Sequence, residues 1–564
     1  MDVIDDEKLQ AILAGTALHL PGESPETARI VRAEWIVEAV RLGLAVDIDN
    51  AIVAGALELE GRYIPAAFSL TNARVSSIDL GEARFLQAAR FDGTVFDGAV
   101  QLAGLRAESD VSFTRARFAS AVDLSNIVVG GSLTFDGVHI DGALTGSGTR
   151  VGVSLSAAGA TVRGVRLTEP QIGADLILDE ARIEGDAIFS ELSVIRHTSA
   201  KRAVFGGDLT LERAQIGGQL ELSEASIRGR SAFRAARVAD AVLAAAASFA
   251  GEVGFEAAQL GELTLSNISF QGPVSLKEAR IARRLLCLQS TFERDATFTG
   301  VGVGGDVNLE DAAFKGAVAM RNADIGGALS CESTTFEQDA DMSDARVARA
   351  ADFTHATFRA PAVFASARLG SIDCTRATFE RDVDFANARA DGAACFRWTT
   401  FRGAAGFQAL RAGSMVAEHA TFSGRADLSD VDCAGDLDLS GVVFEGEAHC
   451  ANLSAKANLI ATEARFDGDA TFAGAKIAGD LRLERATLRG ACSLRAVALG
   501  GGLQAAGATF SRGVNIGVGR VVGGIDFAGA HFAGEAQFGA LSAGGALACA
   551  GASFDGVADA RSAH

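Results

Sequence analysis

The chain has 564 residues, of which 48% are hydrophobic, and its 51 basic and 71 acidic residues give a formal net charge of −20. This acidic excess disfavours direct nucleic-acid binding, because a phosphate backbone attracts proteins of opposite charge. No apolar stretch is long enough for a transmembrane segment. The acidic start, Met-Asp-Val-Ile-Asp-Asp-Glu, lacks the basic and apolar segments of a secretory signal. We therefore expect a cytoplasmic protein.

Residues 1–63 differ in pattern from the rest of the chain and are predicted to form a short α-helical N-terminal cap. One helix is expected over residues 4–14, and a second is expected to begin at Ser24-Pro25 and end near Gly43, with Trp35 on its apolar face. The helices would cover the open end of the following domain. The alternative is a docking helix for a partner. Trp35 is thus a candidate partner-binding residue, and burial against the domain is an equal alternative.

Residues 64–556 carry an apolar residue at every eleventh position. The last part of this series is Phe466, Ile477, Leu488, Leu499, Phe510, Val521, Phe532, Ala543 and Phe554. Successive units differ in type, so the full repeat spans two units, and apolar residues alternate with polar ones as in extended chain. Four short straight segments per 22-residue coil predict an all-β solenoid with a quadrilateral cross-section. The spacing slips by one residue near Leu260, Leu369 and Leu410.

Glycine follows the repeating apolar residue by two positions, as at Gly468, Gly479 and Gly490. Such a glycine serves either a corner with positive φ or a close approach of two backbones. Alanine precedes the same apolar residue by two positions, as in Ala475-Lys476-Ile477 and Ala530-His531-Phe532. A small residue beside each large one fits the narrow interior of a stacked coil.

With these steps the chain resembles the pentapeptide-repeat family, in which a central Leu or Phe follows an Ala by two positions. The resemblance implies a right-handed quadrilateral β-helix. It covers about nine-tenths of the chain, including Ala426-Asp427-Leu428 on the six-residue side of the repeat. The chain departs from the family pattern because every second step holds six residues, which predicts a bulged or flattened cross-section.

No residue pattern indicates catalysis, a cofactor or a metal. The eight cysteines contain no Cys-x-x-Cys pair, and Cys287, Cys331, Cys433, Cys450 and Cys549 occupy repeat positions where they act as small apolar fillers. We therefore assign no catalytic, cofactor-binding or metal-binding residue, and we predict that the protein is not an enzyme.

The outward positions are where a partner would bind. Asp341, Asp384 and Asp427 share an outward position on every second coil and are candidate partner-binding residues. Some relatives in the resembled family imitate duplex DNA with an acidic rod and occupy the DNA site of gyrase, so the resemblance implies a DNA mimic as one alternative. Arginines such as Arg84, Arg117, Arg182, Arg237, Arg280, Arg346 and Arg465 also point outward and give a mixed surface.

Residues 557–564 are expected to form a short C-terminal tail. The preceding coil lacks a capping helix, so we predict a homodimer through the C-terminal coil. The sequence favours a non-catalytic protein-interaction scaffold with a protein partner. The alternatives are a DNA-mimic inhibitor or protector of a type II topoisomerase, and an enzyme or enzyme subunit with a surface site on the solenoid.

Overall fold

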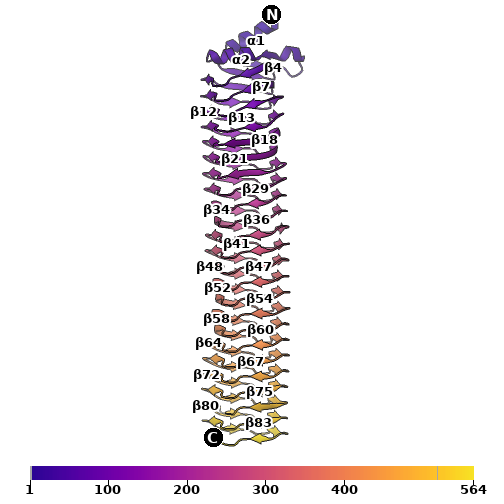
Figure 1. The fold of residues 1–564 in the computed structure, drawn as a ribbon, viewed down its shortest axis with the longest axis vertical. Helices are drawn as coiled ribbons and strands as arrows, with labels where there is room; N and C mark the ends of the chain where they lie inside the picture. Colours follow the sequence, from indigo (N-terminus) through magenta and orange to yellow (C-terminus); the bar gives the residue numbers. More distant parts are fainter. Residues whose placement is uncertain (1–2, 518) are drawn as a thin grey trace. The chain divides into compact units, whose positions relative to one another are not determined.

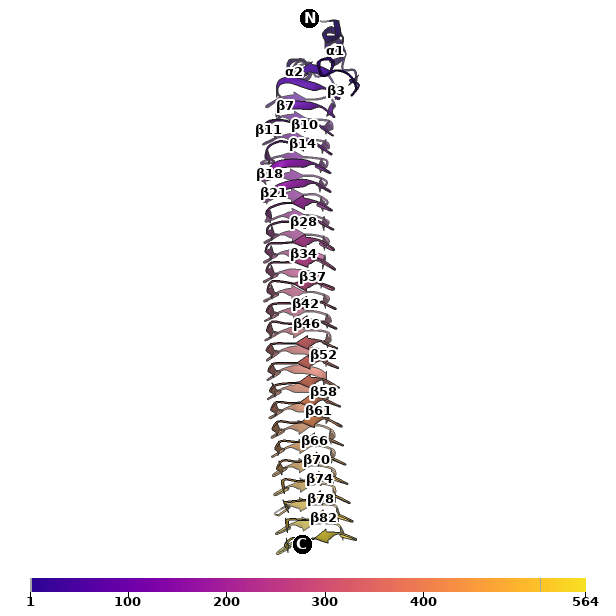
Figure 2. The ribbon, with the colours of Figure 1, turned by 90° about the vertical axis from the view of Figure 1, so that its right-hand side faces the viewer.

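The structure is a computed structural model that describes residues 3–517 and 519–564. The chain divides into two compact units, Met1–Ala282 and Arg283–His564. Within each unit, short strands stack in parallel on strands of the next coil, as the ribbons show (Figures 1 and 2). The prediction of an all-β solenoid is confirmed. No helix among these residues is long and apolar enough to cross a membrane.

One coil of the first unit shows how the repeat builds the fold. It holds four strands of two residues each: β12 (Arg106–Ala107), β13 (Val111–Ser112), β14 (Arg117–Phe118) and β15 (Val122–Asp123). The first two belong to one sheet and the last two to the other. Arg106 pairs with Val128, and Arg117 pairs with His139, each one full repeat further along the chain. The predicted 22-residue coil with four straight segments is therefore confirmed.

The N-terminal segment contains two α-helices, α1 (Val3–Leu13) and α2 (Ala33–Arg41). The expectation of one helix from Ser24 to Gly43 is wrong in its first half. A 3₁₀ turn (Glu26–Arg29) is followed there by β2 (Ile30–Arg32). Strand β2 pairs in parallel with β4 (Ile52–Glu58), and Val31 lies opposite Val53 and is fully buried. Pairing with β4 satisfies the backbone hydrogen-bonding groups of a segment whose apolar spacing alone suggested a helix.

Strand pairing extends into both segments that the sequence pattern set apart from the repeat. Within 1–63, β3 (Val46–Asp49) pairs with β6 (Phe68–Thr71) at the 22-residue interval. Within 557–564, β87 (Ala558–Asp559) pairs with β83 (Glu535–Gln537). The coils therefore begin before residue 64 and continue beyond residue 556.

The core of the second unit contains a column of stacked phenylalanine rings. Neighbouring ring centroids lie 4.5–5.3 Å apart and the rings are nearly parallel. Each ring is essentially inaccessible to solvent. Burial of one such side chain contributes roughly 1.5–3 kcal/mol. The members are Phe292, Phe314, Phe336, Phe358, Phe379, Phe401, Phe422, Phe444 and Phe466.

The expected one-residue slips are present as shifts in strand register. Val238 pairs with Leu260 at the full repeat interval, but Ala241 pairs with Glu262 at an interval one residue shorter. The same shift follows Leu369 in β55 (Arg368–Asp373) and Ala412 in β61 (Arg411–Val416). In these coils one longer strand replaces two short ones. The shortened coil is thus accommodated at one corner, and the core column continues past it.

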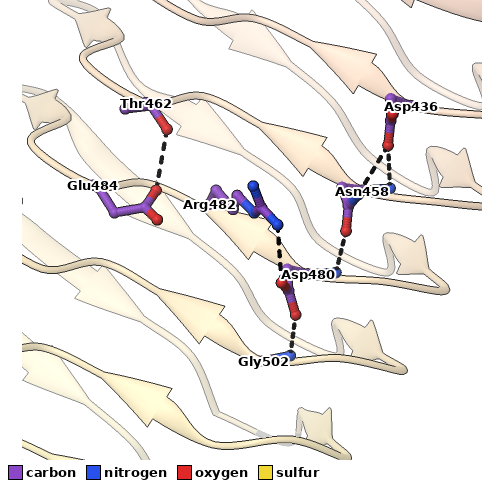
Figure 3. A network of polar contacts seen from close by, with 7 residues as sticks. All are labelled: Asp436, Asn458, Thr462, Asp480, Arg482, Glu484 and Gly502. Carbon is purple, nitrogen blue, oxygen red and sulfur yellow. Dashed lines mark hydrogen bonds and ion pairs between the residues drawn. The ribbon is translucent and has the colours of Figure 1, made fainter.

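A hydrogen-bonded ladder runs along one corner of the second unit (Figure 3). The Asn458 N–H donates to Asp436 Oδ1 at 2.8 Å, the Asp480 N–H donates to Asn458 Oδ1 at 2.9 Å, and the Gly502 N–H donates to Asp480 Oδ1 at 2.8 Å. Each partner lies one full repeat after the last, so each side chain satisfies a backbone donor of the following coil. The ladder therefore couples the corners of successive coils.

The corner glycines are explained by this ladder. A Cβ on Gly479 would overlap Asn458 Oδ1, and a Cβ on Gly501 would overlap Asp480 Oδ1. Neither glycine has a positive φ. Positive φ occurs instead at other corners, for example at Gly474 (72°) and Arg485 (55°). Of the two reasons considered for the recurring glycine, close approach holds at Gly479 and Gly501.

Replacing Gly479 by alanine is expected to lower the free energy of unfolding by about 1–3 kcal/mol, because the added Cβ breaks the bond from the Asp480 N–H to Asn458. Gly539→Ala is the matched control. Its Cβ would lie 3.7 Å from the Arg561 carbonyl oxygen, an ordinary contact. Urea unfolding followed by circular dichroism measures both variants. Equal destabilisation of the two would contradict the close-approach explanation.

Candidate functional site

The three candidate aspartates lie in register on one face of the second unit. They end β51 (Ala340–Asp341), β57 (Val383–Asp384) and β63 (Ala426–Asp427). Val363 lies between Asp341 and Asp384, and Gly406 lies between Asp384 and Asp427. The column is therefore acidic only at alternate coils.

Each of these carboxylates accepts a hydrogen bond from its own coil. Asp341 accepts the Ser343 hydroxyl at 2.6 Å and its N–H at 3.0 Å, and Asp427 accepts the same two groups of Ser429 at 2.6 and 3.1 Å. The side chains of Asp341 and Asp427 are only 18% and 15% exposed. Asp384 accepts a backbone N–H in the same way. The candidate residues thus stabilise the turn that follows their strand.

Neighbouring groups keep Asp341 and Asp427 ionised. Partial burial raises the pKa of Asp341, but the hydrogen bonds from Ser343 and Arg321 outweigh it and hold the pKa below its usual value. Partial burial likewise raises the pKa of Asp427, and Ser429 with other neighbours lowers it overall. These interactions favour the carboxylate, so they stabilise the folded state at pH values above the ordinary pKa of aspartate. This stabilisation is lost as the pH falls through the lowered pKa.

Trp35 lies on α2 and is buried. Its side chain is only 9% exposed, and the Arg32 guanidinium lies 5.7 Å from the centroid of its ring. Helix α2 packs against β4. Trp35 is thus packed in this structure, and its role in partner binding stays a prediction.

An exposed aromatic residue that the sequence analysis did not select lies in the second unit. Trp398 is 54% exposed, and its ring stacks on His419 at a centroid distance of 4.3 Å. Both residues have positive φ, 56° and 57°, at equivalent corners of successive coils. Their separation includes one of the slips and is one residue shorter than the full repeat. Only a search that allowed both the full and the shortened interval would have paired them.

A second missed feature is a column of arginines. Arg346, Arg368, Arg389 and Arg411 begin β52 (Arg346–Asp352), β55, β58 (Arg389–Cys395) and β61, and each pairs in register with the next. In the sequence, each of these arginines directly precedes the repeating apolar residue. Successive arginines are separated by one full interval, then one shortened interval, then one full interval. These four arginines therefore project from adjacent coils of one face.

The comparisons with known proteins agree with this architecture. A family model for pentapeptide repeats, with nine copies, matches residues 343–389. This match and the β-solenoid architecture fit the pentapeptide-repeat family. Searches of curated proteins and of solved structures gave no match. The matched segment contains three of the four arginines of the column, so this feature lies within the recognised repeat.

Most cysteines of this β-solenoid lie in the core. Burial raises the pKa of Cys287 and Cys492 to about 12, and it also raises the pKa of Cys433 to about 12. A thiol with so high a pKa is a poor nucleophile at neutral pH. The expectation of an apolar filler is wrong for Cys549, which is exposed. Across residues 3–517 and 519–564, no three acidic, His or Cys side chains form a group that could hold a metal ion.

A thiol reagent such as Ellman's reagent is expected to modify one cysteine rapidly in the native protein, because Cys549 is exposed and the other seven are buried. All eight should react after denaturation. Cys549→Ser should abolish the rapid phase, whereas Cys492→Ser should leave it intact. A second rapidly reacting thiol in the native protein would contradict the placement of the other cysteines.

Proposed function

We propose that this pentapeptide-repeat protein is a non-catalytic protein-interaction scaffold. The observation that carries the proposal is the exposed Trp398, stacked on His419 at the solenoid surface. Proteins of this family are generally non-catalytic. Tryptophan is enriched among the residues that dominate binding energy at protein interfaces, because it buries a large apolar area with few rotatable bonds.

The surroundings of Trp398 hold it in place before any partner binds. The backbone N–H of Trp398 donates to the Glu418 carbonyl at 2.9 Å, and the backbone N–H of His419 donates to the Ser440 carbonyl at 2.9 Å. Arg397 Nε lies 2.8 Å from Glu418 Oε2. A rigid aromatic ring with a polar rim loses little conformational freedom on binding, so more of the contact energy appears as affinity.

The other candidate residues take a secondary place in this proposal. Trp35 is a buried residue of α2, and Asp341, Asp384 and Asp427 offer partly covered carboxylates to a partner. We place Trp398 at the centre of the binding surface and keep the three aspartates as candidates for additional polar contacts. We also place the scaffold in the cytoplasm, which the eight unpaired cysteine thiols support, since disulfides are rare there.

Trp398→Ala is expected to weaken capture of the protein partner by about 2 kcal/mol, roughly thirtyfold, as for a central interface residue. Val522→Ala is the matched control, since Val522 is also 54% exposed and lies in the same unit. Capture from lysate identifies the partner, and titration of the purified partner measures affinity.

In a Trp35→Phe background Trp398 is the only source of tryptophan fluorescence, and partner binding should shift its emission to shorter wavelength. Unchanged emission and affinity would refute the assignment.

The second candidate function is DNA mimicry at a type II topoisomerase. The net charge of −20 and the column of Asp341, Asp384 and Asp427 favour it. The alternating Val363 and Gly406 and the paired Arg321 and Arg425 argue against a continuous acidic stripe. Recovery of a topoisomerase that is lost with the three aspartates changed to asparagine, but not with Trp398→Ala, would favour mimicry over the scaffold.

We further propose a homodimer through the C-terminal coil. Leu547, Phe554 and Val557 are 63%, 41% and 71% exposed there, and one face of the Phe554 ring stacks on Phe532 at 4.6 Å. A second copy would cover these apolar side chains and the unpaired strand edges.

The double variant Leu547→Glu with Val557→Glu is expected to be monomeric in sedimentation velocity runs in which the unchanged protein is a dimer. Burying two carboxylates at the contact would oppose association. Val522→Glu, which adds a charge on another exposed surface, should remain dimeric. Sedimentation of the unchanged protein as a monomer at tens of micromolar would contradict the dimer proposal.

A further inference from the structure

The arginine column departs from the charge pattern of the surrounding coils. Several basic residues elsewhere in the second unit lie beside a glutamate of the preceding coil, as in Arg359–Glu337 (3.5 Å), Arg402–Glu380 (3.8 Å) and Arg485–Glu463 (2.6 Å). Opposite charges on adjacent strands attract, and like charges repel. Four arginines in register therefore place like charges together, in contrast to these alternating pairs.

The column has little countercharge of its own. Arg389 Nε lies 2.7 Å from Asp391 Oδ1. For Arg346, Arg368 and Arg411, the described part of the chain supplies no carboxylate at ion-pair distance. Adjacent strands are about 4.8 Å apart, so the four side chains begin within about 15 Å of one another. The result is a local positive field on a protein whose net charge is negative.

These arginines line a hollow in the face. A groove of about 780 Å³ is bordered by all four of them and by Asp324 and Asp391, and buried Val347 and Leu369 contribute to its lining. Its volume is within the range of small-molecule sites. The groove coincides with the long strands β52, β55, β58 and β61, where the register shifts by one residue. Such a shift re-aims neighbouring side chains.

The groove suits a short ligand rather than a long polyanion. In the same column, Asp324 pairs with Arg346 at one end and Asp432 pairs with Arg411 at the other. A nucleic-acid strand that continued along the column would meet these carboxylates. A compact ligand of high charge density would contact the arginines between Asp324, which borders one end of the groove, and Asp432, which lies beyond the other.

Phosphate chemistry fits this arrangement best. A guanidinium donates two parallel hydrogen bonds to phosphate oxygens, and two or more linked phosphates carry enough charge to neutralise several arginines in a short distance. Ser366 and Asn387 also border the groove and add a hydroxyl and an amide donor. We propose that this groove binds a compact ligand with two or more linked phosphate groups, either free or carried by a nucleoside.

Calorimetric titration of the full chain with inorganic triphosphate tests the proposal. Arg368→Gln should weaken binding at least tenfold, since Arg368 is flanked by arginines in both neighbouring coils. Arg402→Gln removes an equal charge from an arginine beside Glu380 and should change the affinity less than twofold. Thermal unfolding without ligand should show no loss of stability in Arg368→Gln, because the change relieves like-charge repulsion.

The outcomes separate the sources of the ligand. Equal affinity for triphosphate and ATP supports recognition of the phosphates alone, and tighter binding of ATP supports a nucleoside-borne ligand. If Arg368→Gln fails to fold, Arg368→Lys keeps the charge but loses the guanidinium fork, and it should also bind at least threefold more weakly. No binding of either ligand at millimolar concentration, equal weakening by Arg402→Gln, or tighter binding of oligoglutamate than of triphosphate would overturn the proposal.

Discussion

The constraint on which this structure depends is that one coil cannot bury its own apolar side chains. Each coil places its inward residues against those of the coils before and after it, as Phe358 does between Phe336 and Phe379 at 4.6 and 4.7 Å. A stacked ring tolerates little displacement, so the register of one coil determines the register of the next. Outward residues are aligned by the same register, although they make no contribution to the core.

The eleven-residue spacing was sufficient to predict the solenoid, because most coils pair at twice that spacing and bury alternate residues. The slip near Leu369 was also visible in the spacing. The segment with Val31 was not predictable in this way. Its apolar spacing suits a helix, and only the presence of Val53 as a neighbour in the sheet makes it a strand. The limits of the repeat were misplaced for the same reason, since pairing depends on a partner strand more than on local pattern.

The candidate site was less predictable than the fold. Net charge directed attention to Asp341 and its column, but the structure uses that carboxylate to bind the Ser343 hydroxyl and N–H. The corner ladder of Asp436, Asn458 and Asp480 uses side-chain oxygens in a similar way (Figure 3). Part of the acidic composition therefore satisfies backbone donors. A count of acidic residues does not distinguish this structural use from a surface available to a partner.

Register, more than composition, sets the local chemistry of the surface. Two of the one-residue shifts lie in β55 and β61, which begin with Arg368 and Arg411. Had Arg389 followed Arg368 at the full interval after the shift in β55, its side chain would have left the column. Instead the arginine spacing follows the shortened coils, so the hollow and the positive charge occur at the same place. An accidental excess of arginine has no reason to follow the slips, and this coincidence is why the groove is better explained by a ligand than by a solvated surface.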